Sequence, residues 1–169
     1  MTYEQVKQDA AIKTYISQAD AALEALGFTE HSFPHVTKVA ETAAQILTAL
    51  GYPERTVELA KIAGYMHDIG NVINRVDHSQ SGAVMAFRIL DRMDFPPEEI
   101  ACIISAIGNH DEGSGVPVDA VAAALIIADK SDVRRSRVRD KDSIRSDIHD
   151  RVNYSVTSSK LTIREEQKV

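Results

Sequence analysis

Residues 59–71 read LAKIAGYMHDIGN, and this stretch carries the clearest fold signal of the chain. Apart from Lys61, its first eight residues are apolar or small, which predicts a helix that is buried on most of its surface. The helix is expected to end at His67 and Asp68, because Gly70 interrupts the helical pattern. A buried carboxylate is costly unless a cation or hydrogen-bond donors compensate it. His67 and Asp68 therefore indicate a polar site inside an apolar helical core.

The helical spacing of apolar residues extends through most of the chain on both sides of this stretch. It predicts helices over residues 12–26, 32–50, 53–68, 79–93, 98–109 and 118–129. The last of these, VDAVAAALIIAD, is apolar on almost every side and is expected at the centre of the fold. We therefore expect an all-α fold, in the form of a helical bundle.

Composition narrows the classes of protein to consider. The chain has 169 residues, 44% of them apolar, which is enough for one domain with its own core. The single cysteine, Cys102, excludes an internal disulfide. A net charge of −6 argues against a binder of long nucleic acid. No apolar run approaches the roughly 18 residues of a membrane span, and no signal peptide is visible, so we expect a cytoplasmic protein without a membrane partner.

The C-terminal region differs from the rest of the chain. Residues 130–151 hold eight basic and five acidic residues, a local balance of +3, and a helix is expected there. Residues 152–164 alternate between apolar and polar side chains, which predicts a short β-hairpin. Because an isolated hairpin is only marginally stable, it should pack on the body or pair with a second copy in a homo-oligomer.

Further polar residues interrupt apolar helices in the same way as His67 and Asp68. His35 begins one such helix, His110 follows another, and Asp129 ends the central one. A single histidine at a helix end usually caps the helix or makes a hydrogen bond. Several buried histidines and aspartates together are better explained by a shared metal site.

The order His35, His67-Asp68, Asp129 resembles the HD superfamily of metal-dependent phosphohydrolases, a helical fold named for its His-Asp pair. The surrounding strings HVTKVA, AGYMHDIGN and LIIADKSD resemble it as well. The resemblance covers residues 31–137. It implies an HD domain over those residues, with an N-terminal helix in 1–30 that packs on the core and a C-terminal helix and hairpin in 138–169.

Two more histidines resemble the dimetal branch of that superfamily, which includes HD-GYP cyclic-dinucleotide phosphodiesterases and diadenosine tetraphosphate hydrolases. His78 precedes a helix and His110 follows one, as in that branch. The resemblance implies two divalent ions, which could be iron, manganese, zinc, cobalt or nickel. One ion would take His35, His67, Asp68 and Asp129, and the other would take His78 and His110, with Asp68 bridging.

This ligand set implies hydrolysis of a phosphoester or phosphoanhydride in a small nucleotide-type substrate, with a metal-activated hydroxide as the attacking group. We assign catalytic roles to Asp68 and Lys130. Lys130, Arg134 and Arg137 are candidates to bind the substrate phosphate, although a solvated basic surface explains them equally well. One departure from the dimetal pattern is Asn71, where relatives often carry lysine.

Two other functions remain open at this point. Some oxygenases that use a mixed-valence di-iron centre resemble the same six-ligand scaffold. A non-catalytic domain that senses a nucleotide is the other alternative. The expectation for His31 and His149 is a position at the surface.

Overall fold

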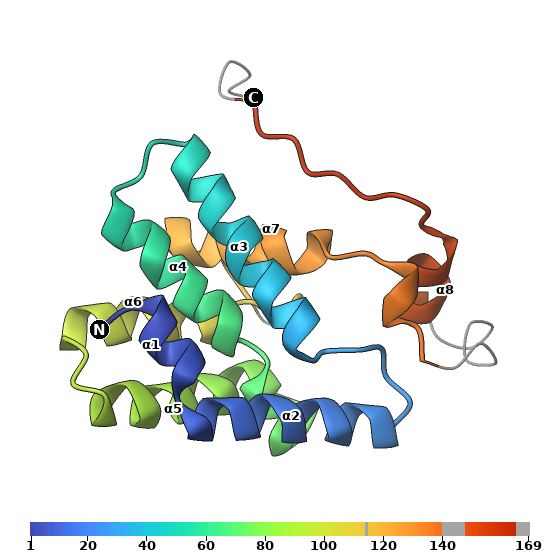
Figure 1. The fold of residues 1–169 in the computed structure, drawn as a ribbon, viewed down its shortest axis with the longest axis horizontal. Helices are drawn as coiled ribbons and strands as arrows, with labels where there is room; N and C mark the ends of the chain where they lie inside the picture. Colours follow the sequence, from blue (N-terminus) through green and yellow to red (C-terminus); the bar gives the residue numbers. More distant parts are fainter. Residues whose placement is uncertain (114, 140–147, 165–169) are drawn as a thin grey trace.

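The computed structural model describes residues 1–113, 115–139 and 148–164, and its ribbon is a bundle of helices (Figure 1). Eight α-helices and two short 3₁₀ turns lie in these residues, and no strand occurs among them. The predicted all-α fold is therefore confirmed. No helix of the described residues is long and apolar enough to cross a membrane.

Three helices form the centre of the bundle: α3 (Phe33–Ala49), α4 (Glu54–Met66) and α7 (Ala120–Ser131). They pack against one another, and α7 lies behind α3 and α4 in Figure 1. The apolar character of residues 118–129 is explained by this position, since α7 buries Val121, Ala122, Ala124, Leu125 and Ala128.

A glycine lets α3 and α4 approach closely. A Cβ atom added at Gly64 would lie 2.8 Å from the Cα atom of Ala40, closer than real Cβ atoms come to a backbone. The contact lies one turn before His67 on α4 and just over one turn after His35 on α3. The close packing therefore brings the two histidines toward each other.

A second pair of helices, α5 (His78–Arg92) and α6 (Pro97–Gly108), packs beside the centre. Between α4 and α5 the chain forms the 3₁₀ turn η1 (Ile69–Val72), which contacts both α5 and α2 (Ala10–Ala25). The short helix α1 (Tyr3–Gln8) precedes α2, and Asp9 ends α1 and caps α2. The buried face of α2 consists of Ile12, Ile16, Ala19 and Leu23.

The predicted C-terminal hairpin is wrong. Residues 148–155 form the helix α8 (Ile148–Ser155), and residues 156–164 continue without strand pairing. The side chain of Asn153 fixes α8 on the body, because its Oδ1 accepts a hydrogen bond from the backbone N–H of Arg134 at 2.9 Å. Alternation over a few residues did not distinguish a strand from a helix whose buried face is polar. Because these residues form no hairpin, the expectation that two copies pair through it has no support.

The helix expected over residues 130–151 is interrupted. Helix α7 ends at Ser131, and the chain then forms the 3₁₀ turn η2 (Arg135–Arg137), which packs against α8. Residues 140–147 lie outside the described part of the chain.

Candidate metal centre

Four histidines and two aspartates from five helices and their ends meet in the interior of the bundle. His35 comes from the first turn of α3, His67 and Asp68 from the end of α4, and His78 from the start of α5. His110 follows α6, and Asp129 lies in the last turns of α7. The structure thus brings together the six residues that the sequence proposed as ligands. That they bind metal stays a prediction.

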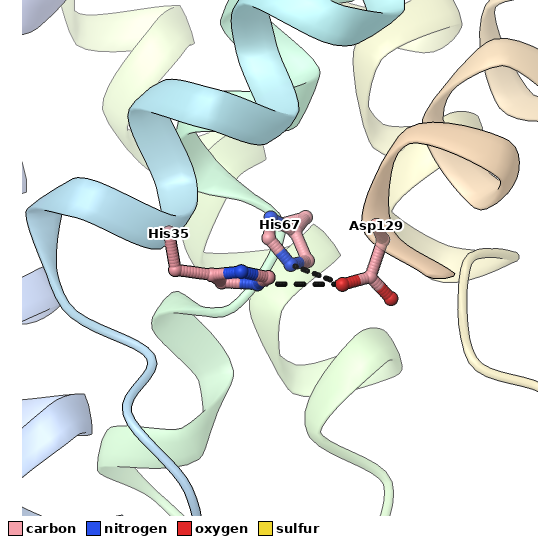
Figure 2. A group of neighbouring side chains, drawn as sticks. All are labelled: His35, His67 and Asp129. Carbon is pink, nitrogen blue, oxygen red and sulfur yellow. Dashed lines mark ion pairs between the residues drawn. The ribbon is translucent and has the colours of Figure 1, made fainter. Parts of the chain in front are cut away.

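One half of the cluster consists of His35, His67 and Asp129 (Figure 2). The Nε2 atoms of His35 and His67 lie 3.3 and 3.6 Å from Oδ1 of Asp129. The same two nitrogens lie 3.6 and 3.1 Å from Oδ2 of Asp68. Two imidazoles and two carboxylates therefore point at a common centre.

The other half of the cluster consists of His78 and His110, which face the second carboxylate oxygen of Asp68. Oδ1 of this residue lies 3.5 Å from Nε2 of His78 and 3.9 Å from Nε2 of His110. The two Nε2 atoms are 3.1 Å apart. Asp68 thus faces one half with each of its oxygens, which is the arrangement that a bridging carboxylate needs.

All four histidines use Nδ1 in the same way. Their Nδ1 atoms lie within hydrogen-bond distance of an acceptor, at 2.7 to 3.1 Å: Asp132 Oδ2 for His35, Gly64 O for His67, Arg75 O for His78 and Ile107 O for His110. An acceptor at Nδ1 requires the proton there. Each Nε2 of the neutral ring is then left with its lone pair directed at the cluster, as in metal-binding histidines.

Three buried polar atoms without a hydrogen-bond partner show that the cluster fits a bound cation. Among the described residues, Nε2 of His35, Nε2 of His67 and Oδ2 of Asp68 are buried and form no hydrogen bond. Such atoms are costly unless something compensates them. All three converge on the half of the cluster shown in Figure 2, so the residues present fit a divalent metal ion there.

The carboxylates also control protonation when no metal is bound. Burial alone would lower the pKa of His35 and His67, but the neighbouring aspartates outweigh it and raise the values to about 9 and about 10. The two histidines in turn hold the pKa of Asp68 and Asp129 well below the usual range, although burial opposes this. Burial and the charge of His67 lower the pKa of His110 to about 4.

Two buried residues orient the aspartate and histidine ligands. The amide of Asn71 donates to the carbonyl oxygen and to Oδ1 of Asp68, both at 3.0 Å. Asp132 is buried and binds Nδ1 of His35. Asn71 thus holds the central carboxylate in place.

Four residues of the cluster, Asp68, His78, His110 and Asp129, line a cavity of about 330 Å³. Its walls include apolar residues from two sides, Phe28 before α3 and Val152 on α8. Lys130 lies at the wall, where its ammonium group pairs with Asp129 at 2.9 Å and with Glu112.

The arginines proposed for phosphate binding have partners within the protein. Arg134 donates to both oxygens of Asp132, at 2.7 and 3.0 Å, and pairs with Glu30 at 3.1 Å. Arg137 is buried and donates to the backbone carbonyls of Glu30 and Asp132. These contacts fix Asp132 behind His35, and the role of the arginines toward a phosphate stays a prediction.

His31 was expected at the surface, and this is wrong. Its ring lines the cavity with its centre 5.3 Å from that of His35. Burial lowers its pKa to about 3, and its Nδ1 hydrogen-bonds the carbonyl of Thr29 at 2.7 Å. The spacing of four residues from His35 was the signal that pointed to this position. His149 is exposed, and it also lies at the cavity.

Comparison with known proteins agrees with this geometry. An uncharacterized protein of Methanocaldococcus jannaschii is 25% identical over 162 residues, which cover 82% of this chain. The chain spans 62% of the length of that relative. The crystal structure of a predicted HD superfamily hydrolase from an uncultured Thermotogales bacterium superimposes with a TM-score of 0.58 and 26% identity, over 73% of this chain and 67% of that one.

The family model of the HD domain matches residues 33–141, which include all six residues of the cluster. This match confirms the resemblance seen in the strings around His35, His67 and Asp129. The chain therefore belongs to the HD domain family, within the superfamily of metal-dependent phosphohydrolases.

Proposed function

We propose that this chain is a metal-dependent phosphohydrolase that cleaves a phosphoester or phosphoanhydride bond of a small nucleotide-type substrate. The observation that carries the proposal is the common orientation of four histidines, each with Nδ1 against an acceptor and Nε2 toward the cluster. A divalent ion, when bound, lowers the pKa of water and neutralises phosphate oxygens.

Each residue of the cluster has a separate role in this proposal. His35, His67 and Asp129 offer donors to one ion, and His78 and His110 offer donors to a second. Asp68 faces both halves, and the amide of Asn71 holds its Oδ1 in place. The cavity volume of about 330 Å³ lies within the range of small-molecule binding sites. Phe28 and Val152 form an apolar part of the cavity wall that a nucleobase can contact.

The activity test uses chelator-treated protein that is reloaded separately with Mn²⁺, Fe²⁺, Co²⁺, Ni²⁺ or Zn²⁺. Each sample is incubated with a nucleoside triphosphate, a cyclic dinucleotide and a dinucleotide polyphosphate, and the products are separated by chromatography. We expect hydrolysis of at least one substrate class, which Asp68→Asn abolishes and Asp119→Asn retains. Oxygen consumption without hydrolysis, or no turnover with any metal, would contradict the proposal.

The number of ions is tested by elemental analysis of loaded variants. If each half of the cluster holds one ion, His78→Ala and His110→Ala each lose one ion and keep the other. A variant that keeps both ions, or a wild-type chain that binds a single ion, would contradict the dimetal site.

A further inference from the structure

Three cationic side chains line the cavity, and two of them already face a carboxylate. Lys130 pairs with Asp129 at 2.9 Å, and Arg137 has the carboxylate of Asp132 at 4.0 Å. The third is Arg75, in the segment between η1 and α5. No carboxylate of the described residues forms an ion pair with the guanidinium of Arg75. Of these three cations, Arg75 is therefore the one without a carboxylate partner among those residues.

The guanidinium of Arg75 has neutral neighbours. One of its terminal nitrogens, Nη1, lies 3.3 Å from Nε2 of His78 and 3.4 Å from Oδ1 of Asn71. The guanidinium carbon lies 5.7 Å from the ring centre of Phe28, within cation–π range. The group is thus held beside the His78 half of the cluster, and within the described part of the chain its hydrogen-bond contacts involve Nη1 alone.

The contact with His78 is one that a metal would end. Nδ1 of His78 hydrogen-bonds the backbone carbonyl of Arg75 at 3.1 Å, so the lone pair that Arg75 meets on Nε2 is the one directed at the cluster. A single lone pair does not serve an ion and a guanidinium together. With a cation on His78, the contacts of the Arg75 guanidinium among the described residues are the 3.4 Å contact to Asn71 and the ring of Phe28, and neither carries a negative charge. An anion is therefore its fitting partner.

We infer that Arg75 binds a phosphate oxygen of the substrate at the end of the cavity formed by His78 and His110. The inference rests on the proposed function, and it assigns the phosphoryl group to a residue outside the basic segment after α7. A guanidinium suits this role, because its planar fork donates two parallel hydrogen bonds to a phosphate. The ring of Phe28 supports the plane from one side.

The test compares Arg75→Gln with Arg88→Gln in the full chain. Arg88 lies on α5 with its side chain 81% exposed, and it is absent from the cavity wall. Both variants and the wild type are loaded with Mn²⁺, and inorganic phosphate is titrated in by calorimetry. Elemental analysis of the same samples gives the metal content, and thermal unfolding reports whether each variant is folded.

We expect Arg75→Gln to bind inorganic phosphate about 10- to 100-fold more weakly than the wild type, with an unchanged metal content. Arg75→Lys should fall between the two, because it keeps the charge and loses the fork. Arg88→Gln should stay within about twofold of the wild type. If Arg75→Gln does not fold, Arg75→Lys carries the comparison.

Unchanged phosphate affinity in Arg75→Gln, or in Arg75→Lys where that variant carries the comparison, would overturn the inference. Loss of an ion from the variant would also overturn it, since Arg75 would then act by supporting His78. A wild-type chain that binds no phosphate would do the same. Phosphate binding that depends on Arg75 without hydrolysis of any substrate would leave the inference standing and remove the proposed function.

Discussion

Asp132 shows how a buried residue can control the cluster through the hydrogen bond that it makes to one of the proposed ligands. Its carboxylate is buried and lies 2.9 Å from Nδ1 of His35, while Arg134 donates to both of its oxygens. Hydrogen bonds from His35 and Arg134 lower the pKa of Asp132 although burial opposes them. A charged acceptor at Nδ1 makes Nε2 of His35 a better ligand and fixes its ring.

We therefore predict that Asp132→Asn weakens metal binding by the His35 half of the cluster about 10- to 100-fold. Competition with a chromogenic chelator measures this affinity. The control is Asp119→Asn, because Asp119 caps the opposite end of α7 and an asparagine caps equally well. A lower melting temperature with unchanged metal affinity would show that Asp132 has only a structural role.

The proposed ligands could be predicted from the sequence, whereas the residue that supports His35 could not. Four of the proposed ligands are polar side chains at the ends of apolar helices, where burial is expected: His35, His67, Asp68 and Asp129. A polar side chain in a buried stretch is a signal that the sequence shows directly. The link between His35 and Asp132 spans 97 positions and exists only once α3 and α7 are packed. Asp132 was for this reason missed as a partner.

At the scale of elements, the position of η1 against α5 determines whether the two halves of the cluster meet. A Cβ atom added at Gly70 would lie 2.0 Å from the carbonyl oxygen of His78 and 2.5 Å from the backbone nitrogen of Gly82. Neither backbone atom can yield without moving α5. Glycine at position 70 thus sets the distance between Asp68 and His78.

We predict that Gly70→Ala destabilises the fold by about 1–3 kcal/mol, as overpacking does, and lowers the metal content of the His78 half. Gly108→Ala is the matched control, because its Cβ would lie 3.6 Å from that of Ala83, an ordinary van der Waals contact between α6 and α5. Urea unfolding and elemental analysis provide the two measurements. A Gly70→Ala variant with wild-type stability and metal content would contradict this account of η1.

The helices were largely predictable, because each long one has an apolar face at helical spacing. Helix α3 runs over Phe33–Ala49 where residues 32–50 were expected, and α6 over Pro97–Gly108 where 98–109 were expected. The hairpin failed because the face of α8 that packs on the body carries Asp150 and Asn153. Because the buried face of α8 is polar, its sequence lacks the helical spacing of apolar residues from which the other helices were predicted.

At the scale of the whole molecule, the bundle encloses charges that it must balance when no metal is bound. The pKa of His35 is raised to about 9 and that of His67 to about 10 by the neighbouring aspartates, against the effect of burial. In the unfolded chain both values return to about 6.5. Between these limits the folded state holds more protons than the unfolded state, so raising the pH reduces the free energy of unfolding.

We predict that metal-free protein has the full stabilisation from these histidines below about pH 6.5 and loses it as the pH approaches 9 to 10. Asp68 and Asp129, whose pKa values are lowered, lose their contribution only on acidification below about pH 4. A metal ion competes with the histidine protons, so its affinity should increase over the range in which metal-free stability decreases. At a free concentration a hundred times Kd, the ion adds about 2.7 kcal/mol.

Urea unfolding at pH 6, 7.5 and 9, with a chelator or with Mn²⁺, measures both curves. The difference in free energy of unfolding between the two samples should widen from pH 6 to pH 9, because protons leave the same nitrogens that the ion needs. His35→Gln removes one of the titrating groups and should flatten the metal-free curve. Metal-free stability that stays constant or rises between pH 6.5 and 9 would show that the paired imidazoles and carboxylates do not hold the interior together.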